Sequence, residues 1–207
     1  MFSSGLLKPA PNLHLFRETD LFDDSSKQWK RWGDDDPWYG VLSEPRYRQG
    51  LDRQAFFGSG QEYWDHIILM CSELGLYFEP NSRVLEFGCG VGRVLIPMAK
   101  QFPKPVGVDI SPGMLAEAKI QLDEYPADLF LASGRHPLPI PENQKFEIVH
   151  SALVFQHIPA RRGIKILQSL LQALAPGGVA IIQAPYRTDQ PLRYSLNRLR
   201  ASHQILF

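Results

Sequence analysis

VLEFGCGVGR, residues 84–93, is the stretch that decides the fold of this chain. It starts as a short apolar run and continues into a turn with glycine at positions 88, 90 and 92. A second apolar run, residues 106–108, ends on Asp109, about 20 residues beyond the first glycine. A buried strand that enters a glycine turn, with a carboxylate at the end of the next strand, is the arrangement that holds a ribose-bearing cofactor. We therefore predict one cofactor site here.

On both sides of this stretch the chain alternates strand and helix patterns. Such alternation predicts a parallel sheet with helices on both faces and right-handed crossovers. The expected fold is α/β, a Rossmann-like three-layer α/β/α sandwich with a mostly parallel sheet. Strands are expected at residues 83–87, 105–110, 129–132, 146–151 and 179–184. Helices are expected at 59–74, 92–101 and 112–124, and in a segment marked by Ile164, Leu167, Leu171 and Leu174 that Pro176, Gly177 and Gly178 end.

The two ends of the chain lack this alternation. Residues 1 to about 37 show no sustained period, so we expect an irregular N-terminal segment over 1–54, partly packed on the domain through its aromatic residues. The domain is expected over 55–207, with its core at 83–185. No further pair of strands follows, so we expect the C-terminal antiparallel hairpin to be lacking. The chain is then either a C-terminally truncated fragment or a reduced domain.

Composition narrows the class of protein. The 207 residues carry 22 Lys and Arg against 22 Asp and Glu, a zero net charge that gives no support for nucleic-acid partners. The two cysteines show no CxxC spacing and the histidines no HxxxH spacing, so we predict no disulfide framework and no metal. No apolar run reaches the roughly 20 residues of a membrane span, and the N-terminus lacks signal-peptide features. We expect a cytoplasmic protein with no membrane partner; no pattern indicates its oligomeric state.

The glycine spacing indicates which cofactor is bound. It is G-x-G-x-G, whereas the dinucleotide fingerprint is G-x-G-x-x-G. Glu86 would repel a pyrophosphate, but a cofactor with an ammonium and a sulfonium centre tolerates it. With Asp109 this pattern resembles the class I S-adenosylmethionine-dependent methyltransferases. The resemblance covers about residues 55–185, through matching stretches at 84–93, 106–111, 146–151, 156–159 and 174–178.

The resemblance implies S-adenosyl-L-methionine as cofactor and a role for each matching position. Gly88 and Gly90 would let the backbone approach its methionine part, since a Cβ there would collide with it. Glu86 would face the amino group, Asp109 would accept hydrogen bonds from both ribose hydroxyls, and Ile110 would flank the adenine ring. The family often has an Asp or Asn after the third strand; here a serine or a backbone carbonyl would substitute. The implied cofactor-binding residues are Glu86, Gly88, Cys89, Gly90, Gly92, Arg93, Asp109, Ile110 and Ser133.

For each singled-out residue a structural interpretation competes with the functional one. The glycines could form a turn without a ligand, and Asp109 could serve only the dipole of the following helix. Cys89 is expected to be an inert packing residue and His150 a structural one. His157 follows the fourth strand at the carboxyl edge of the sheet, so it is the candidate catalytic base, and a structural hydrogen bond is its alternative.

The leading hypothesis is methyl transfer to an oxygen or nitrogen nucleophile of a small-molecule acceptor by direct in-line displacement. A non-catalytic S-adenosylmethionine-binding domain or fragment is the main alternative. An NAD or nucleotide-sugar enzyme is disfavoured by the glycine spacing and Glu86. A protein or nucleic-acid methyltransferase is disfavoured because residues 152–155 read ALVF, not the Asn/Asp-Pro-Pro-Tyr of the adenine-amino methyltransferases.

Overall fold

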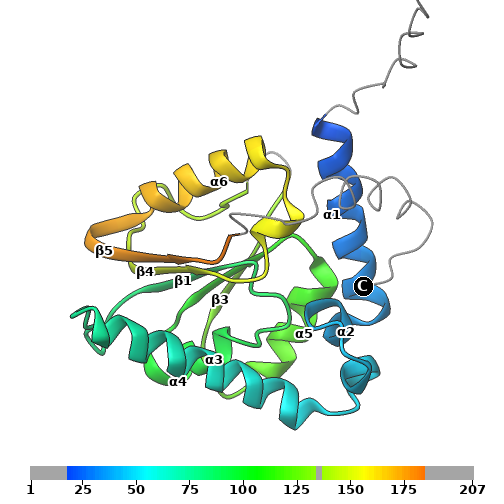
Figure 1. Ribbon diagram of the computed structural model, residues 1–207, viewed down its shortest axis with the longest axis horizontal. Coiled ribbons are helices and arrows are strands. Elements are labelled where there is room, and N and C mark those ends of the chain that lie inside the picture. The colour runs from blue at the N-terminus through cyan, green and yellow to red at the C-terminus, as the bar shows by residue number, and fades with distance from the viewer. Residues whose placement is uncertain (1–17, 134–136, 185–207) are drawn as a thin grey trace, which may run out of the picture.

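A five-stranded parallel sheet forms the centre of the computed structural model, which describes residues 18–133 and 137–184 (Figure 1). The strand order is β3-β2-β1-β4-β5, so the order reverses between β1 and β4, the switch point at which open α/β sheets bind ligands. All four strand pairings are parallel. The strands are β1 (Val84–Phe87), β2 (Val106–Asp109), β3 (Asp128–Leu131), β4 (Phe146–Ser151) and β5 (Leu174–Ile182).

Helices cover both faces of the sheet, which confirms the predicted three-layer α/β/α architecture (Figure 1). Alternate strand residues point to opposite faces. Val84 and Ile148 therefore pack under α3, α4 and α5, whereas Leu85 and Val149 pack under α6. The helix bounds are α3 (Arg53–Glu73), α4 (Leu95–Gln101), α5 (Pro112–Gln121) and α6 (Ala160–Gln172).

The N-terminal segment is helical where it is described, so the prediction of irregular structure is wrong there. Trp29 and Trp32 lie three residues apart and so share one helix face. Both pack against the aromatic core around Trp38 and Met114. Tertiary packing, not a regular apolar period, makes this segment helical. The elements are α1 (Glu18–Asp35), α2 (Pro37–Val41) and the 3-10 helix η1 (Pro45–Gly50).

α1 crosses the N-terminus of α5 at close range. A Cβ on Gly33 would collide with Ser111 Oγ, and a Cβ on Gly113 would collide with Gly33 O. Ser111 is the N-cap of α5, as predicted, and its Oγ accepts a hydrogen bond from Met114 N at 3.3 Å. This contact positions α1 beside the carboxyl edge of the sheet.

The acidic run at residues 34–36 ends in a structural cap. Asp36 is buried and is the N-cap of α2. Its Oδ1 accepts hydrogen bonds from Tyr39 N at 3.5 Å and from Gln49 N at 3.0 Å. The run therefore joins α1 to α2 and η1. Asp followed by proline is a helix-start signal as well as a feature of irregular segments, so the sequence pattern fits both structures.

α3 begins six residues earlier than the predicted start at residue 59. Asp52 is its N-cap and accepts a hydrogen bond from Ala55 N at 3.1 Å. Ser59 lies inside the helix, where its hydroxyl donates to Phe56 O at 2.7 Å. The earlier start is favoured because it buries Phe56 completely. The predicted stop is confirmed, since Gly75 follows the last turn with a φ of +75°.

The helix predicted before the last strand presents a different apolar stripe to the core. Ile166 and Leu170 are buried, whereas Ile164 and Leu171 are 58% and 48% exposed. Both sets have helical spacing, so the pattern alone does not select between them. α6 ends at Gln172, before residues 176–178, which lie inside β5 where its register with β4 shifts.

Some predictions fall outside the described ranges. The expected absence of a C-terminal hairpin concerns residues 185–207, and part of the 1–54 segment precedes residue 18. Over 18–133 and 137–184, no helix is long and apolar enough to cross a bilayer. In the same part of the chain, no three side chains of metal-binding type are grouped together.

Candidate active site

A cavity lies at the carboxyl edge of the sheet, beyond the ends of β1, β2 and β4. Together with the solvent space at its open mouth, it encloses about 1020 Å³. His157 lines it, as do all the predicted cofactor residues except Gly92. Those lining residues are Glu86, Gly88, Cys89, Gly90, Arg93, Asp109, Ile110 and Ser133.

The glycine turn forms one wall of the cavity. Gly88 and Gly90 have φ angles of +78° and +53°, in the region that favours glycine. The N–H groups of Gly88 and Cys89 both donate to Val108 O, at 2.7 and 3.1 Å, which holds the turn against β2. A Cβ on Gly88 would collide with Val154 Cγ2. The turn can therefore approach its neighbours only because these positions lack side chains.

Gly92 has a different place from the other two glycines. It does not line the cavity, and its φ is +86°. A Cβ built there would lie 3.7 Å from Ala118 Cβ on α5. Gly92 thus allows the turn to pass between the cavity and α5. α4 begins at Leu95, three residues after the predicted start, because the turn continues to Val94.

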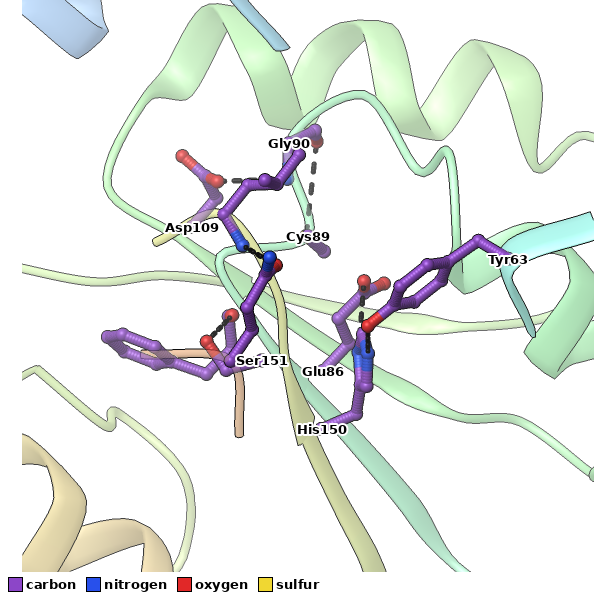
Figure 2. Close-up of polar contacts among 10 residues, drawn as sticks. Tyr63, Glu86, Cys89, Gly90, Asp109, His150 and Ser151 are labelled. Atoms are coloured by element: carbon purple, nitrogen blue, oxygen red, sulfur yellow. Dashed lines mark hydrogen bonds and ion pairs between the residues drawn. The ribbon is translucent and has the colours of Figure 1, made fainter. Parts of the chain in front are cut away.

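Asp109, at the end of β2, ties the turn to α5. Its Oδ2 accepts from Gly90 N at 2.9 Å (Figure 2). Its Oδ1 accepts from Ser111 N at 2.9 Å. Burial raises the pKa of Asp109, and the backbone N–H groups of Ser111 and Gly90 oppose that rise. A carboxylate has about four acceptor positions. With the backbone N–H groups of Ser111, Gly90 and Ile110 bonded to it, the carboxylate keeps part of its acceptor capacity for a ligand.

Glu86, on β1, is a buried carboxylate beside a buried histidine of β4. His150 Nδ1 lies 3.5 Å from Glu86 Oε1, and His150 Nε2 lies 3.1 Å from the hydroxyl of Tyr63 on α3 (Figure 2). Glu86 Oε2 is buried and has no hydrogen-bond partner within the protein. Burial, and then the charge of Glu86, raise the pKa of Tyr63, so its phenol stays protonated.

Arg93 follows the glycine turn and is buried on the same side of the sheet. Its guanidinium carbon lies 5.6 Å from the centroid of the Tyr63 ring, and Nη1 donates to Ser59 Oγ at 3.4 Å. Burial lowers the pKa of Arg93, and the charge of Glu86 opposes that effect. The cavity wall therefore carries a cation in contact with α3 and an anion in contact with His150 of β4.

Cys89 also lines the cavity, but its chemistry is that of a packing residue. Burial first, and then the charges of Asp109 and Glu86, raise the pKa of its thiol well above the ordinary value. A protonated, buried thiol is a poor nucleophile. This agrees with the expectation that Cys89 is inert.

The opposite wall is formed by α1 and by the loop after β4. Ser25 Oγ donates to His157 O at 2.9 Å, and the rings of Trp29 and His157 lie 4.9 Å apart, edge to face. Gln156 Nε2 lies 3.1 Å from His157 Nε2. Leu153, in the same loop, has a φ of +60° and donates its N–H to Gln183 Oε1 at 3.0 Å. α1 therefore covers the cavity over His157.

Sequence reasoning missed Tyr63 and Ser25 as residues near the site, and it expected Trp29 mainly to cover apolar surface. It interpreted His150 as structural, although the sequence held a signal that His150 lies beside Glu86. Glu86 and His150 are paired positions of adjacent parallel strands, and side chains at paired positions share a face. A carboxylate and an imidazole inside two apolar strands therefore had to meet. No comparable signal places Trp29, because its contact depends on how α1 crosses α5.

The comparisons with known proteins agree with this geometry. A family model described as a methyltransferase domain matches residues 56–205. Trans-aconitate 2-methyltransferase of Rhodopseudomonas palustris (strain BisA53) is 34% identical over 117 residues, which cover 56% of this chain and 43% of that protein. Carboxy-S-adenosyl-L-methionine synthase of Trichodesmium erythraeum (strain IMS101) is 30% identical over 127 residues, 56% of this chain and 47% of that protein. The chain spans less than half the length of these relatives.

Solved structures share the fold. Phosphoethanolamine N-methyltransferase 1 of Haemonchus contortus, in complex with phosphoethanolamine and S-adenosylhomocysteine, superposes with a TM-score of 0.63 at 14% identity, covering 81% of this chain and 33% of that one. Magnesium protoporphyrin IX methyltransferase of Synechocystis PCC 6803, with bound S-adenosylmethionine, gives 0.58 at 21% identity and covers 93% and 88%. At these identities the likeness supports the fold alone.

Proposed function

Because this chain belongs to the methyltransferase-domain family, we propose that it transfers the methyl group of S-adenosylmethionine to an oxygen or nitrogen nucleophile of a small-molecule acceptor. The observation that carries the proposal is the pair of carboxylates, Glu86 and Asp109, that line one cavity on either side of an open glycine turn. Both have acceptor positions that the protein does not use. A pyrophosphate would be repelled by this pair, whereas a ribose and an ammonium group would satisfy it.

The residues fit the proposed cofactor at three points. Asp109 offers its remaining acceptor capacity to the ribose hydroxyls, beyond its bonds to the backbone of Gly90, Ser111 and Ile110. Glu86 Oε2 is a buried acceptor without a partner, and such groups in native proteins require explanation. Gly88 and Gly90 line the cavity and adopt the left-handed backbone that brings the turn to its wall. In this proposal Arg93 faces the cofactor carboxylate, Ile110 faces the adenine ring and Ser133 its amino group.

Methyl transfer requires little from the side chains of the enzyme other than that they position the acceptor. When bound, the cofactor supplies a methyl group made electrophilic by its sulfonium. The protein holds the acceptor in line with that bond, which is worth about 7–11 kcal/mol in well-oriented reactions. Trp29 and its neighbours on α1 line one side of the cavity and would limit the access of water to the bound acceptor. These contributions favour direct in-line displacement without a covalent enzyme intermediate.

His157 is the proposed base for an acceptor that must lose a proton. It lines the cavity on the wall opposite the glycine turn. Gln156 Nε2 lies 3.1 Å from His157 Nε2 and holds the ring at the cavity wall. An imidazole in that place is the side chain that most often serves as a general base.

A small-molecule acceptor is favoured over a nucleic acid by the zero net charge and by the cover that α1 places over the cavity. The relative from Rhodopseudomonas palustris is named for methylation of trans-aconitate, a small molecule. We propose the same class of acceptor here and no nucleic-acid or membrane partner.

Calorimetric titration of the purified chain tests the proposal. S-adenosylmethionine and S-adenosylhomocysteine are expected to bind, and NAD is not. Binding of NAD with no binding of either adenosyl compound would refute the cofactor assignment. A panel of small hydroxyl, amine and carboxylate acceptors with radiolabelled methyl donor then tests transfer. Tight cofactor binding with no turnover on that panel would favour a non-catalytic binding domain.

A further inference from the structure

A polar set is buried under the glycine turn where the surrounding core is apolar. Glu86 and His150 are paired across β1 and β4, and His150 is completely buried. Tyr63 reaches them from α3, and Figure 2 shows its hydroxyl and the Glu86 carboxylate both pointing to the His150 ring. Burial of polar groups costs stability unless they are paired. Their presence in the core therefore indicates a task that apolar side chains cannot perform.

The charge of Glu86 determines where the protons of this set lie. A carboxylate only accepts hydrogen bonds, so the His150 nitrogen that faces it, Nδ1, carries the ring proton. His150 Nε2 is then an acceptor, and the Tyr63 hydroxyl, 3.1 Å away, donates to it. This donor chain has one hydrogen bond, between Tyr63 and His150, and one longer polar contact, because His150 Nδ1 lies 3.5 Å from Glu86 Oε1 and makes no hydrogen bond within the described protein.

The other oxygen of Glu86 is left for the cavity. Oε2 is buried without a partner in the protein, and Glu86 lines the cavity. Oε1 faces His150 Nδ1 at 3.5 Å, which leaves Oε2 as the oxygen directed away from the histidine. Oε2 is therefore an oriented acceptor for a donor that enters the cavity.

Tyr63 also contacts the cation of the same wall. The Arg93 guanidinium lies 5.6 Å from the centroid of the Tyr63 ring, within the range of cation–π attraction. Arg93 lines the cavity as well. One residue of α3 thus touches Arg93 with its ring and reaches Glu86, through His150, with its hydroxyl.

We propose that Tyr63 and His150 are positioning residues that orient Glu86 and Arg93 to recognise an amino-acid zwitterion. An ammonium group matches Glu86 Oε2, and a carboxylate matches the Arg93 guanidinium. The inference rests on the proposed function, because the zwitterion is the methionine end of the cofactor. It predicts that this end, and not the adenosine, is recognised through α3.

Two ligands separate this inference from a general loosening of α3. S-adenosylhomocysteine carries the zwitterion, whereas 5′-methylthioadenosine has the same adenosine and a thioether without it. Tyr63→Phe keeps the ring and removes only the hydroxyl. Loss of one hydrogen bond in the donor chain is expected to weaken S-adenosylhomocysteine binding by about 3- to 10-fold in calorimetry. Binding of 5′-methylthioadenosine is expected to change by less than about twofold.

Tyr77→Phe is the matched control, because it removes the same hydroxyl from an exposed tyrosine beyond the end of α3. It should leave both affinities unchanged. If Tyr63→Phe weakens the binding of both ligands equally, or of neither, the inference is overturned. The proposed function still stands in that case, provided that the wild type binds S-adenosylhomocysteine. Failure of the wild type to bind S-adenosylhomocysteine would overturn both.

His150 provides a second, independent test. His150→Phe removes both nitrogens, and His150→Asn keeps an N–H donor near the Nδ1 position. The phenylalanine variant should lose S-adenosylhomocysteine affinity selectively, and the asparagine variant should recover part of it. If both variants bind 5′-methylthioadenosine and S-adenosylhomocysteine as tightly as the wild type does, His150 has no positioning role.

Discussion

The two walls of the cavity are built in different ways. The glycine-turn side, residues 86–93 with Asp109, comes from one strand-turn-helix-strand unit and is held largely by backbone hydrogen bonds. The covering side, α1 with residues 152–158, joins Ser25 to His157 across 132 positions of the chain. The first wall follows from local sequence, and the second exists only after the domain has folded. The difference suggests a division of labour, in which one wall binds the cofactor and the other acts on the acceptor.

The covering side gives the largest expected effect. His157→Ala is expected to lower turnover on an identified acceptor by about 100-fold or more, because a positioned general base contributes roughly 10²- to 10⁴-fold. S-adenosylhomocysteine affinity should stay within about twofold of the wild type. Single-turnover kinetics and calorimetry measure the two quantities on the same preparation.

His66→Ala is the control for this variant, since His66 is exposed on α3 and does not line the cavity. It should change neither quantity. If His157→Ala instead weakens cofactor binding and spares turnover, the division between the two walls is wrong.

The glycine-turn side is tested most directly at Asp109. Asp109→Ala is expected to weaken S-adenosylhomocysteine binding on the order of 100-fold, because two hydrogen bonds to a charged group are lost at about 1.5–3 kcal/mol each, partly offset by water. Asp128→Ala is the matched control, as its carboxylate pairs with Lys104 at a distance of 2.9 Å outside the cavity. An unchanged affinity in Asp109→Ala would mean that Asp109 does not hold the ribose.

The same contrast explains how far the sequence could be interpreted. The turn, the parallel sheet and Asp109 were predictable because strand runs, glycine spacing and a strand-end carboxylate are local patterns. Eight of the nine predicted cofactor residues do line one cavity, and the ninth, Gly92, lies beside α5. Whether these residues bind the cofactor remains for the titrations to decide.

The rest was unpredictable for physical reasons. α1 is helical because Trp29 and Trp32 pack on the aromatic core, and no local period announces that packing. The inward face of α6 was assigned to Ile164 in place of Ile166, because two apolar stripes share the same spacing. Tyr63 was missed because a tyrosine in an amphipathic helix has no signature until its partner on another element is known.

Gly88 joins the two walls and gives a smaller effect, on stability. Gly75→Ala is expected to cost about 1 kcal/mol of unfolding free energy from its left-handed backbone alone, since nothing lies within 4 Å of its Cβ position. Gly88→Ala has nearly the same φ but adds a collision with Val154 of the covering side, so about 2 kcal/mol is expected. Urea unfolding measures both. Equal costs would mean that the walls are not in tight contact at this point.

The smallest expected effect is a pH dependence that belongs to the glycine-turn side. Burial raises the pKa of Asp109 above its usual value of 3.8. The proposed ribose contacts need the carboxylate, so a proton competes with the ligand and affinity falls as the pH is lowered. 5′-methylthioadenosine isolates this effect, because it lacks the groups that would contact Glu86 and Arg93.

Calorimetry between pH 7 and pH 4.5 should therefore show a loss of a few fold in the affinity of the wild type for 5′-methylthioadenosine. The loss should begin at a higher pH than an ordinary aspartate would allow, and its slope cannot exceed about tenfold per pH unit because one proton is taken up. Asp109→Asn should bind weakly but with a flat profile, since its amide does not titrate. A wild-type profile that is also flat would mean that Asp109 stays ionised over this range or that it does not contact the ribose. An equally steep profile in Asp109→Asn would assign the titration to another group, and the glycine-turn side would then not control the pH response.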